Sequence, residues 1–111
     1  MAQFEATTTD VDGVLRVALA GECDLAVSDR LRAVLSTAVH TGRPVLVDLS
    51  GLAFLDSSGV HNLVTAHHAA RARGGRLAVV NARGAVATVL ELTGVGALLG
   101  DPPGTAGAGG G

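Results

Sequence analysis

The sequence predicts an α/β fold: a single domain with a mostly parallel sheet of four to five strands, an N-terminal edge hairpin and helices packed against the sheet. The chain has 111 residues, a length that suits one domain. Hydrophobic residues make up 48% of it, which favours an ordered core. Strand-like and helix-like segments alternate along most of the chain, a pattern typical of parallel strands joined by right-handed crossovers.

The N-terminal hairpin is predicted from two strand-like runs around a turn. Residues 3–9 alternate loosely in polarity and are rich in threonine, which favours an edge strand. Asp12-Gly13 is a hairpin-type turn, because glycine tolerates the positive φ that such turns need. Val14–Ala20 is predicted as the second strand. We expect Gly21 to end it.

The first helix is marked by a start signal, an apolar stripe and a stop signal. Asp24 is a candidate N-cap. Gly42 is well placed to end the helix, and Pro44 cannot continue it. Between them, apolar residues recur at intervals of three and four, as on one face of a helix: Val27, Leu31, Val34, Leu35 and Ala38.

The second half of the chain continues the alternation. Val45–Leu49 is short and almost wholly apolar, which suits a parallel strand covered on both faces. A helix follows, and Gly74-Gly75 is expected to end it. The elements predicted after this strand are a helix from about Ser58 to Arg73, a strand over Leu77–Val80, a helix over Ala85–Leu92 and a short apolar segment over Val95–Leu99.

The chain is predicted to divide into a folded domain and a tail. Residues 1–100 contain every predicted element. Residues 101–111 are rich in glycine, alanine and proline and contain no apolar residue larger than alanine. Such a segment cannot offset the entropy cost of ordering, so we expect a flexible tail.

Charge and aromatic content argue against nucleic-acid binding. The net charge is −2 and all eight basic residues are arginines, which are scattered apart from Arg71, Arg73 and Arg76. The only aromatic residues of the Phe, Tyr and Trp type are Phe4 and Phe54. A basic stripe with aromatic side chains for stacking on bases is therefore absent from the sequence.

Cysteine usage and hydropathy narrow the class of protein further. Cys23 is the only cysteine, so no intrachain disulfide and no multi-cysteine zinc site can form, and the acidic neighbours Glu22 and Asp24 disfavour its thiolate. The N-terminus lacks the features of a secretion signal, and no run of about 20 apolar residues occurs. We therefore expect a cytoplasmic protein that does not associate with a membrane.

The segment between the strand Val45–Leu49 and the following helix carries the candidate chemistry. It brings Ser57 and Ser58 to a helix N-terminus beyond the carboxyl end of a parallel strand, where α/β sheets often place functional loops. The unpaired amides and the helix dipole make this position a natural site for an anion. Serine is also a good N-cap, so simple capping is an alternative, compatible with modification of the other serine.

Several separated motifs resemble the STAS family of anti-sigma factor antagonists. Val47–Gly59, with the sequence VDLSGLAFLDSSG, resembles the signature in which a buried strand leads to Asp-Ser-Ser-Gly. Gly21–Asp24 is similar to the Gly-Glu-hydrophobic-Asp motif before the family's first helix, with Cys23 in place of the usual leucine or isoleucine. Gly74–Val80 and Leu90–Val95 also match, so the resemblance covers the chain to about Leu99.

The resemblance implies a single STAS domain in a bacterial partner-switching system that controls transcription, for example in a stress response. An unmodified antagonist of this family binds an anti-sigma factor with serine kinase activity and so releases a sigma factor. The kinase then phosphorylates the antagonist, and a phosphatase removes the phosphate. Matched by residue, the acceptor is Ser57, Asp56, Ser58 and Gly59 complete the motif, and Asp24 lies beside the partner surface.

The partner surface is predicted on the exposed side of the second helix. This side is expected to present His61, Asn62, Thr65 and Ala69, and its lack of charge suits a protein partner. His61 stands where the family often has a small or apolar residue, a departure that bears on which partner is recognised. A STAS domain that acts only as a scaffold or adaptor, in a stress-signalling or transporter-associated complex, is the alternative function.

Metal and enzymatic functions are disfavoured by spacing and by missing motifs. His61, His67 and His68 do not share one helical face, and His67 points toward the apolar stripe, which predicts a satisfied core or boundary histidine. A hydrolase with Ser57 or Ser58 as nucleophile needs a base in reach, and the chain lacks G-x-S-x-G, a P-loop and kinase motifs. We therefore predict no enzymatic activity, no metal and no cofactor.

Overall fold

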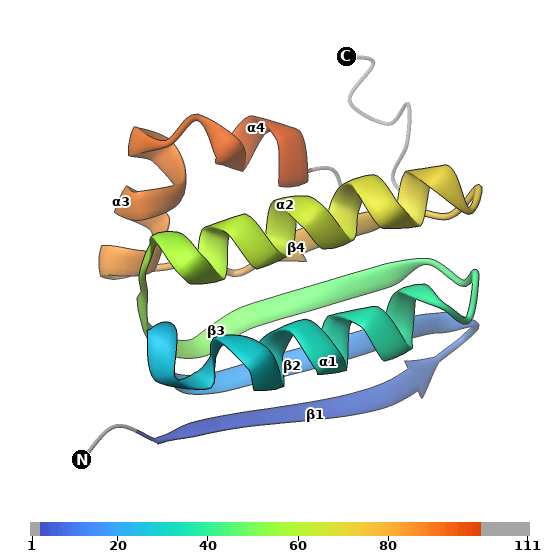
Figure 1. Cartoon of the computed structure of the whole chain (residues 1–111), viewed down its shortest axis with the longest axis horizontal. Coiled ribbons are helices and arrows are strands. Elements are labelled where there is room, and N and C mark those ends of the chain that lie inside the picture. The colour runs from blue at the N-terminus through green and yellow to red at the C-terminus, as the bar shows by residue number, and fades with distance from the viewer. Residues whose placement is uncertain (1–2, 101–111) are drawn as a thin grey trace.

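The computed structural model describes residues 3–100, and its element order is the predicted one (Figure 1). The predicted tail, residues 101–111, lies outside the described residues. The elements are β1 (Phe4–Val11), β2 (Val14–Cys23), the 3-10 helix η1 (Leu25–Val27), α1 (Ser28–Val39), β3 (Val45–Leu55), α2 (Ser57–Ala72), β4 (Leu77–Val80), α3 (Gly84–Leu92) and α4 (Val95–Leu99).

The four strands form one sheet in the order β1-β2-β3-β4. β1 pairs with β2 in an antiparallel hairpin, and β2, β3 and β4 are parallel. The predicted turn is present, because Asp12 and Gly13 both have positive φ angles of 53° and 87°, as a two-residue primed turn requires. The predicted α/β fold with a mostly parallel sheet and an edge hairpin is confirmed.

Gly21 does not end the second strand, so this prediction was wrong. β2 continues to Cys23, with a register shift between Gly21 and Glu22. Gly21 has a φ of 95°, and a Cβ on it would overlap the carbonyl oxygen of Gln3. The amide of Glu22 donates a hydrogen bond to that carbonyl over 2.7 Å. The glycine thus allows two backbones to approach closely within the hairpin.

The connection predicted after Leu49 is mostly strand. β3 runs from Val45 to Leu55, and its second half pairs with the end of β2, with Gly51 opposite Ala20 and Leu55 opposite Cys23. Ser50-Gly51 has low strand propensity, but pairing with β2 overrides this local preference. Asp56 alone therefore separates β3 from α2, which fixes the start of α2 at the edge of the sheet.

The core lies between the sheet and the helices. α1 and α2 run side by side across the sheet, and α3 and α4 lie beyond the β4 side (Figure 1). Leucine, valine and alanine fill this core as predicted, while Phe54 is 44% exposed. The largest fully buried side chains include Leu19, Leu31, Leu35, Leu49, Leu55, Leu63 and Leu99. None of the helices in residues 3–100 has the length and apolar character needed to cross a membrane.

A buried charge lies on the other face of β3. Asp48 accepts hydrogen bonds from Arg16 Nη2 over 2.6 Å, from the Ser50 amide over 2.9 Å and from Asn81 Nδ2 over 3.1 Å. Burial raises the pKa of Asp48, but these hydrogen bonds outweigh burial and hold it below its usual value. Asp48 thus links β2, β3 and the segment after β4 through polar contacts.

Candidate functional site

The N-terminus of α2 is capped by Asp56, which has an extended backbone. Its Oδ1 accepts hydrogen bonds from the amides of Ser58, over 3.0 Å, and Gly59, over 3.2 Å. The interpretation that a serine caps this helix was therefore wrong, because the preceding aspartate takes both amides. The anion site predicted at this helix end is already filled by a carboxylate of the chain itself.

The two serines of the motif have different surroundings. Ser58 is half-buried, and its Oγ donates a hydrogen bond of 2.6 Å to Asp56 Oδ1. Ser57 is exposed as the first residue of α2. Within the described part of the chain, no hydrogen bond engages the Ser57 hydroxyl. Of the two hydroxyls, that of Ser57 is therefore the more available to another protein.

Asp56 is held in its ionised form. Partial burial raises its pKa, but hydrogen bonds from the Ser58 hydroxyl, the Gly59 and Ser58 amides and the backbone of Leu25 together lower it below the usual value. The contact with Leu25 also joins the start of α2 to η1. A negative charge therefore lies next to Ser57 at neutral pH.

Asp24 and Asp56 occupy the ends of two neighbouring strands, β2 and β3. Asp24 accepts a hydrogen bond of 3.0 Å from the Ala26 amide and so caps the short helix η1, whereas the N-cap of α1, which it was predicted to be, is Val27. The Asp56 amide donates to the Cys23 carbonyl over 3.1 Å. The parallel sheet therefore brings these two sequence motifs together at one edge.

Cys23 lies beneath this acidic edge and is fully buried. Burial, followed by the charges of Asp56 and Asp24, raises the pKa of its thiol to about 11. The sequence prediction of a disfavoured thiolate is confirmed, although burial contributes more than the flanking charges. Cys23 is a packing residue under the site.

Gly59 allows α2 to pack closely on the strand ends. A Cβ at this position would collide with Leu55 Cδ1 and lie 3.0 Å from Cys23 Sγ. Both neighbours are buried, so neither side chain has free space to move into. Family resemblance pointed to Gly59, and the structure supplies the physical reason for a glycine in the first turn of α2.

The exposed side of α2 differs from the prediction at one residue. His61, Thr65 and Ala69 are exposed, as expected. Asn62 is only 8% exposed, and its Nδ2 donates hydrogen bonds to the carbonyl and the hydroxyl of Ser28, at 3.1 and 2.9 Å. The placement of Asn62 on the exposed side was therefore wrong. Its spacing of four from the buried Ala66 was the sequence signal for this burial.

His67 is a core histidine, as predicted. It is 7% exposed, and its Nδ1 lies 3.2 Å from the Leu77 carbonyl oxygen. Its Nε2 has no hydrogen-bond partner among the described residues. In residues 3–100, no group of three or more histidine, cysteine or acidic side chains is arranged to hold a metal ion.

The fold and this motif-bearing edge define a small α/β domain, and comparison with known proteins identifies the family. The model of the family described as "Mlab, STAS domain" matches residues 6–100. The chain therefore belongs to the STAS domain family. A search of the curated proteins finds no match.

Solved structures similar to this chain include anti-sigma factor antagonists. One from Mycobacterium paratuberculosis is 25% identical with a TM-score of 0.82, and the match covers 91% of this chain and 86% of that one. The antagonist SpoIIAA in its unphosphorylated form is 26% identical with a TM-score of 0.72 and 84% coverage of each chain. The Bacillus protein SpoIIAA is also similar in its phosphorylated form, at 26% identity, a TM-score of 0.65 and 86% coverage of each chain.

Transporter proteins share the same fold. The murine anion transporter Slc26a9 matches 87% of this chain over 19% of its own length, at 19% identity and a TM-score of 0.67. At this level of identity the similarity concerns the fold alone.

Proposed function

We propose that this protein is an anti-sigma factor antagonist that is switched by phosphorylation of Ser57. The observation that carries the proposal is the contrast between the two serines of the motif. The Ser57 hydroxyl is exposed at the first position of α2, while the Ser58 hydroxyl is bound to Asp56 over 2.6 Å. Similarity to solved anti-sigma factor antagonists, one of them in phosphorylated form, supports the same assignment.

The unmodified protein binds an anti-sigma factor with serine kinase activity. The contact surface comprises the start of α2 and its exposed side, with Asp24, Ser57, His61, Thr65 and Ala69. This surface borders an apolar groove of about 230 Å³ between α1 and α2, which Thr65 and Ala69 help to line. A groove with mostly apolar walls suits a protein partner.

Phosphorylation acts on the interface more than on the fold. A phosphate on Ser57 adds about −1.5 to −2 charges. The Ser58 and Gly59 amides already donate to Asp56, so they are not free to hold the phosphate. The phosphate therefore projects toward the partner, close to the ionised Asp56. Its bulk and its repulsion from acidic groups weaken the complex, and a phosphatase reverses this state.

The chain supplies the substrate hydroxyl, and the partner supplies the catalyst. The carboxylate beside the serines belongs to Asp56, whose pKa is lowered. A carboxylate with a lowered pKa is a weak general base, so it does little to activate a serine as a nucleophile. ATP, metal and catalytic groups belong to the kinase, and the exchange of partners takes place in the cytoplasm.

The experiment that tests this function is phosphorylation by a kinase-type anti-sigma factor, which is first sought among the genes that neighbour this one. The purified wild type, Ser57→Ala and Ser58→Ala are incubated with the kinase and ATP, and the phosphate is located by peptide mass spectrometry. We expect phosphate on Ser57 in the wild type and in Ser58→Ala, and none in Ser57→Ala. Phosphate found only on Ser58 would overturn the assignment.

The alternative function is a STAS scaffold that binds partners without being switched. The fold is compatible with it, since transporter proteins contain the same fold. The two functions differ in one measurement. A scaffold retains the same affinity for its partner after treatment with kinase and ATP, whereas a switched antagonist loses it.

A further inference from the structure

We propose that a second site, at the C-terminal end of α2, binds a small tetrahedral oxyanion, either free or as the phosphate group of a small metabolite. The site comprises His67, Arg71 and Arg76. It is independent of the proposed switch, because it lies at the opposite end of α2 from Ser57, about 21 Å away along the helix axis.

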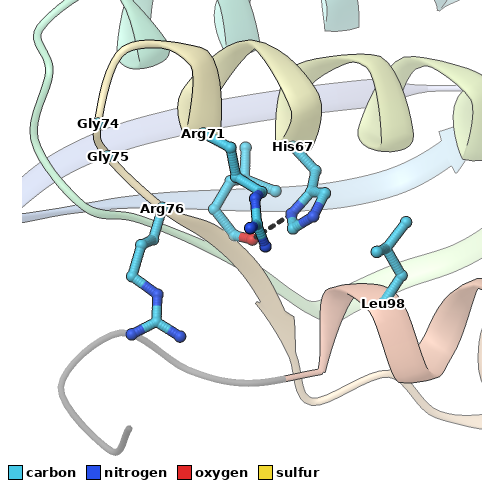
Figure 2. A pocket seen from close by; sticks show the side chains of 7 residues that line it. His67, Arg71, Gly74, Gly75, Arg76 and Leu98 are labelled. Carbon is cyan, nitrogen blue, oxygen red and sulfur yellow. Dashed lines mark hydrogen bonds between the residues drawn. The ribbon is translucent and has the colours of Figure 1, made fainter.

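The site is a pocket of about 430 Å³ between the end of α2, the start of β4 and α4. Figure 2 shows Arg71 and Arg76 beside it, with His67 and Leu98 on the other side. Its volume lies in the range of about 300–1,000 Å³ that is typical of small-molecule sites. The pocket is therefore large enough for a phosphate with a small organic group attached.

The first observation concerns the wall of the pocket. His67 is 7% exposed and contacts the Leu77 carbonyl through Nδ1. Figure 2 shows the imidazole between Arg71 and Leu98. Its Nε2 is shielded from solvent, so a ligand in the pocket does not reach it. His67 therefore forms part of the wall, and the anion is held by the arginines.

The second observation is the charge of the pocket rim. Arg71 lies in the last turn of α2 and Arg76 immediately before β4, so two guanidinium groups border one cavity. The ion pairs formed within residues 3–100 use other arginines, namely Arg16, Arg32 and Arg43. Guanidinium groups bind the oxygens of phosphate and sulfate in a bidentate manner, which makes these anions the chemical class that fits.

The helix end itself does not repel such an anion strongly. The last carbonyls of a helix are normally free and carry partial negative charge. Here the Gly75 amide donates to the Ala70 carbonyl over 2.8 Å and the Gly74 amide to the Arg71 carbonyl over 3.0 Å, in a Schellman arrangement. These carbonyls are therefore already paired.

The test is an NMR titration of the full ¹⁵N-labelled chain with inorganic sulfate at constant ionic strength. We expect saturable shifts at the amides of Gly74, Gly75 and Leu77 and at the His67 imidazole. Parallel titrations with inorganic phosphate and glycerol 3-phosphate distinguish a free anion from a phosphorylated metabolite by which of the two binds more tightly.

Matched variants separate the pocket from general electrostatics. Arg71→Gln with Arg76→Gln should weaken sulfate binding at least about tenfold, because both charged donors are lost. Arg73→Gln removes a similar charge from the same exposed segment, outside the pocket, and should change the affinity less than about twofold.

Three results would overturn the site: shifts that rise linearly without saturation, equal weakening by Arg73→Gln and by the double variant, or saturable shifts confined to the start of α2. The substituted arginines are all exposed, so these variants should fold like the wild type. Their outcome does not depend on whether Ser57 is phosphorylated, so it stands or falls separately from the proposed switch.

Discussion

The two ends of α2 differ in the charges that surround them: the N-terminal end is acidic and the C-terminal end is basic. At the N-terminal end, where the helix dipole favours an anion, Asp56 already accepts the Ser58 and Gly59 amides. At the C-terminal end, where the dipole disfavours an anion, Arg71 and Arg76 border a pocket on a buried histidine. Side chains, more than the dipole, therefore decide where this helix can bind a ligand anion.

This difference also separates two uses of phosphate. At the start of α2 a phosphate would be covalently attached to Ser57 and would find an acidic neighbour and occupied amides. At the other end a phosphate would be a ligand that two guanidinium groups attract. The first arrangement suits a signal that breaks a protein contact, and the second suits reversible binding of a small molecule.

The largest expected effect concerns the acidic end. Phosphorylation of Ser57 should weaken binding to the kinase-type anti-sigma factor by about 3 kcal/mol, which is more than a hundredfold. Ser57→Asp carries less charge and should weaken it by at least about tenfold, whereas Ser57→Ala should bind like the wild type. Isothermal titration calorimetry measures all three. If Ser58→Asp weakened binding to the anti-sigma factor more than Ser57→Asp does, our assignment of Ser57 would be wrong.

Glycines at the two ends should respond differently to substitution. Gly59→Ala places a methyl group against Leu55 and Cys23, so we expect a net loss of about 1–2 kcal/mol in the free energy of unfolding, even after the gain in helix propensity. Gly74→Ala meets no atom within 4 Å but has a φ of 80°, so its loss of about 1 kcal/mol is conformational.

Asparagine separates these two causes in urea unfolding experiments. It tolerates the left-handed conformation, so Gly74→Asn should recover most of the stability that Gly74→Ala loses. Gly59→Asn should lower the free energy of unfolding more than Gly59→Ala does, because the larger asparagine side chain meets the same buried neighbours. Recovery by asparagine at position 59 would show that packing is not the reason for that glycine.

Removal of the cap should have a smaller effect. Asp56→Ala leaves the Ser58 and Gly59 amides without their acceptor and should lower the free energy of unfolding by about 1 kcal/mol. Asp56→Asn retains a capping oxygen, so it should lower the free energy of unfolding less than Asp56→Ala does. Arg71→Ala, at the other end, has no comparable hydrogen bond within the described residues and serves as the matched control, with an expected change within about 0.5 kcal/mol. An equal loss in the control would contradict the special role of Asp56.

The sequence was sufficient to predict the fold because each buried element carries a clear periodic pattern. The strand Leu77–Val80 and the short segment Val95–Leu99 have the bounds that were predicted. Gly21 and Ser50-Gly51 misled the prediction, because local propensity favours a break at both places. Pairing between the ends of β2 and β3 overrides it, and such pairing is not visible in either segment alone.

The site was predicted in position but not in its internal bonding. Motifs placed Asp56, Ser57 and Ser58 at the start of α2, and resemblance selected Ser57. That Asp56 caps the helix and that Asn62 faces α1 depend on side-chain directions set by packing across elements. The pocket at the other end was missed because its residues join only when α2, β4 and α4 are packed together.

The smallest expected effect is the pH dependence of the Asp56 contribution. Its pKa is lowered in the folded state, since hydrogen bonds outweigh the upward effect of burial. Its stabilisation is therefore complete above the unfolded pKa of about 3.9 and is lost as the pH falls through the folded pKa. The difference in unfolding free energy between the wild type and Asp56→Asn should be constant above about pH 5 and shrink below it, by about 0.3–1 kcal/mol in total.

This difference between two proteins isolates Asp56, because Asp48 and Asp10 also have lowered pKa values and contribute equally to both. Ser58→Ala removes one of the hydrogen bonds that lower the Asp56 pKa, so in that background the total decrease of the difference should be smaller and should be complete at a higher pH. Urea unfolding at a series of pH values measures both. A difference that grows on acidification would mean that the Asp56 charge destabilises the start of α2, and the contrast between the two helix ends would then be lost.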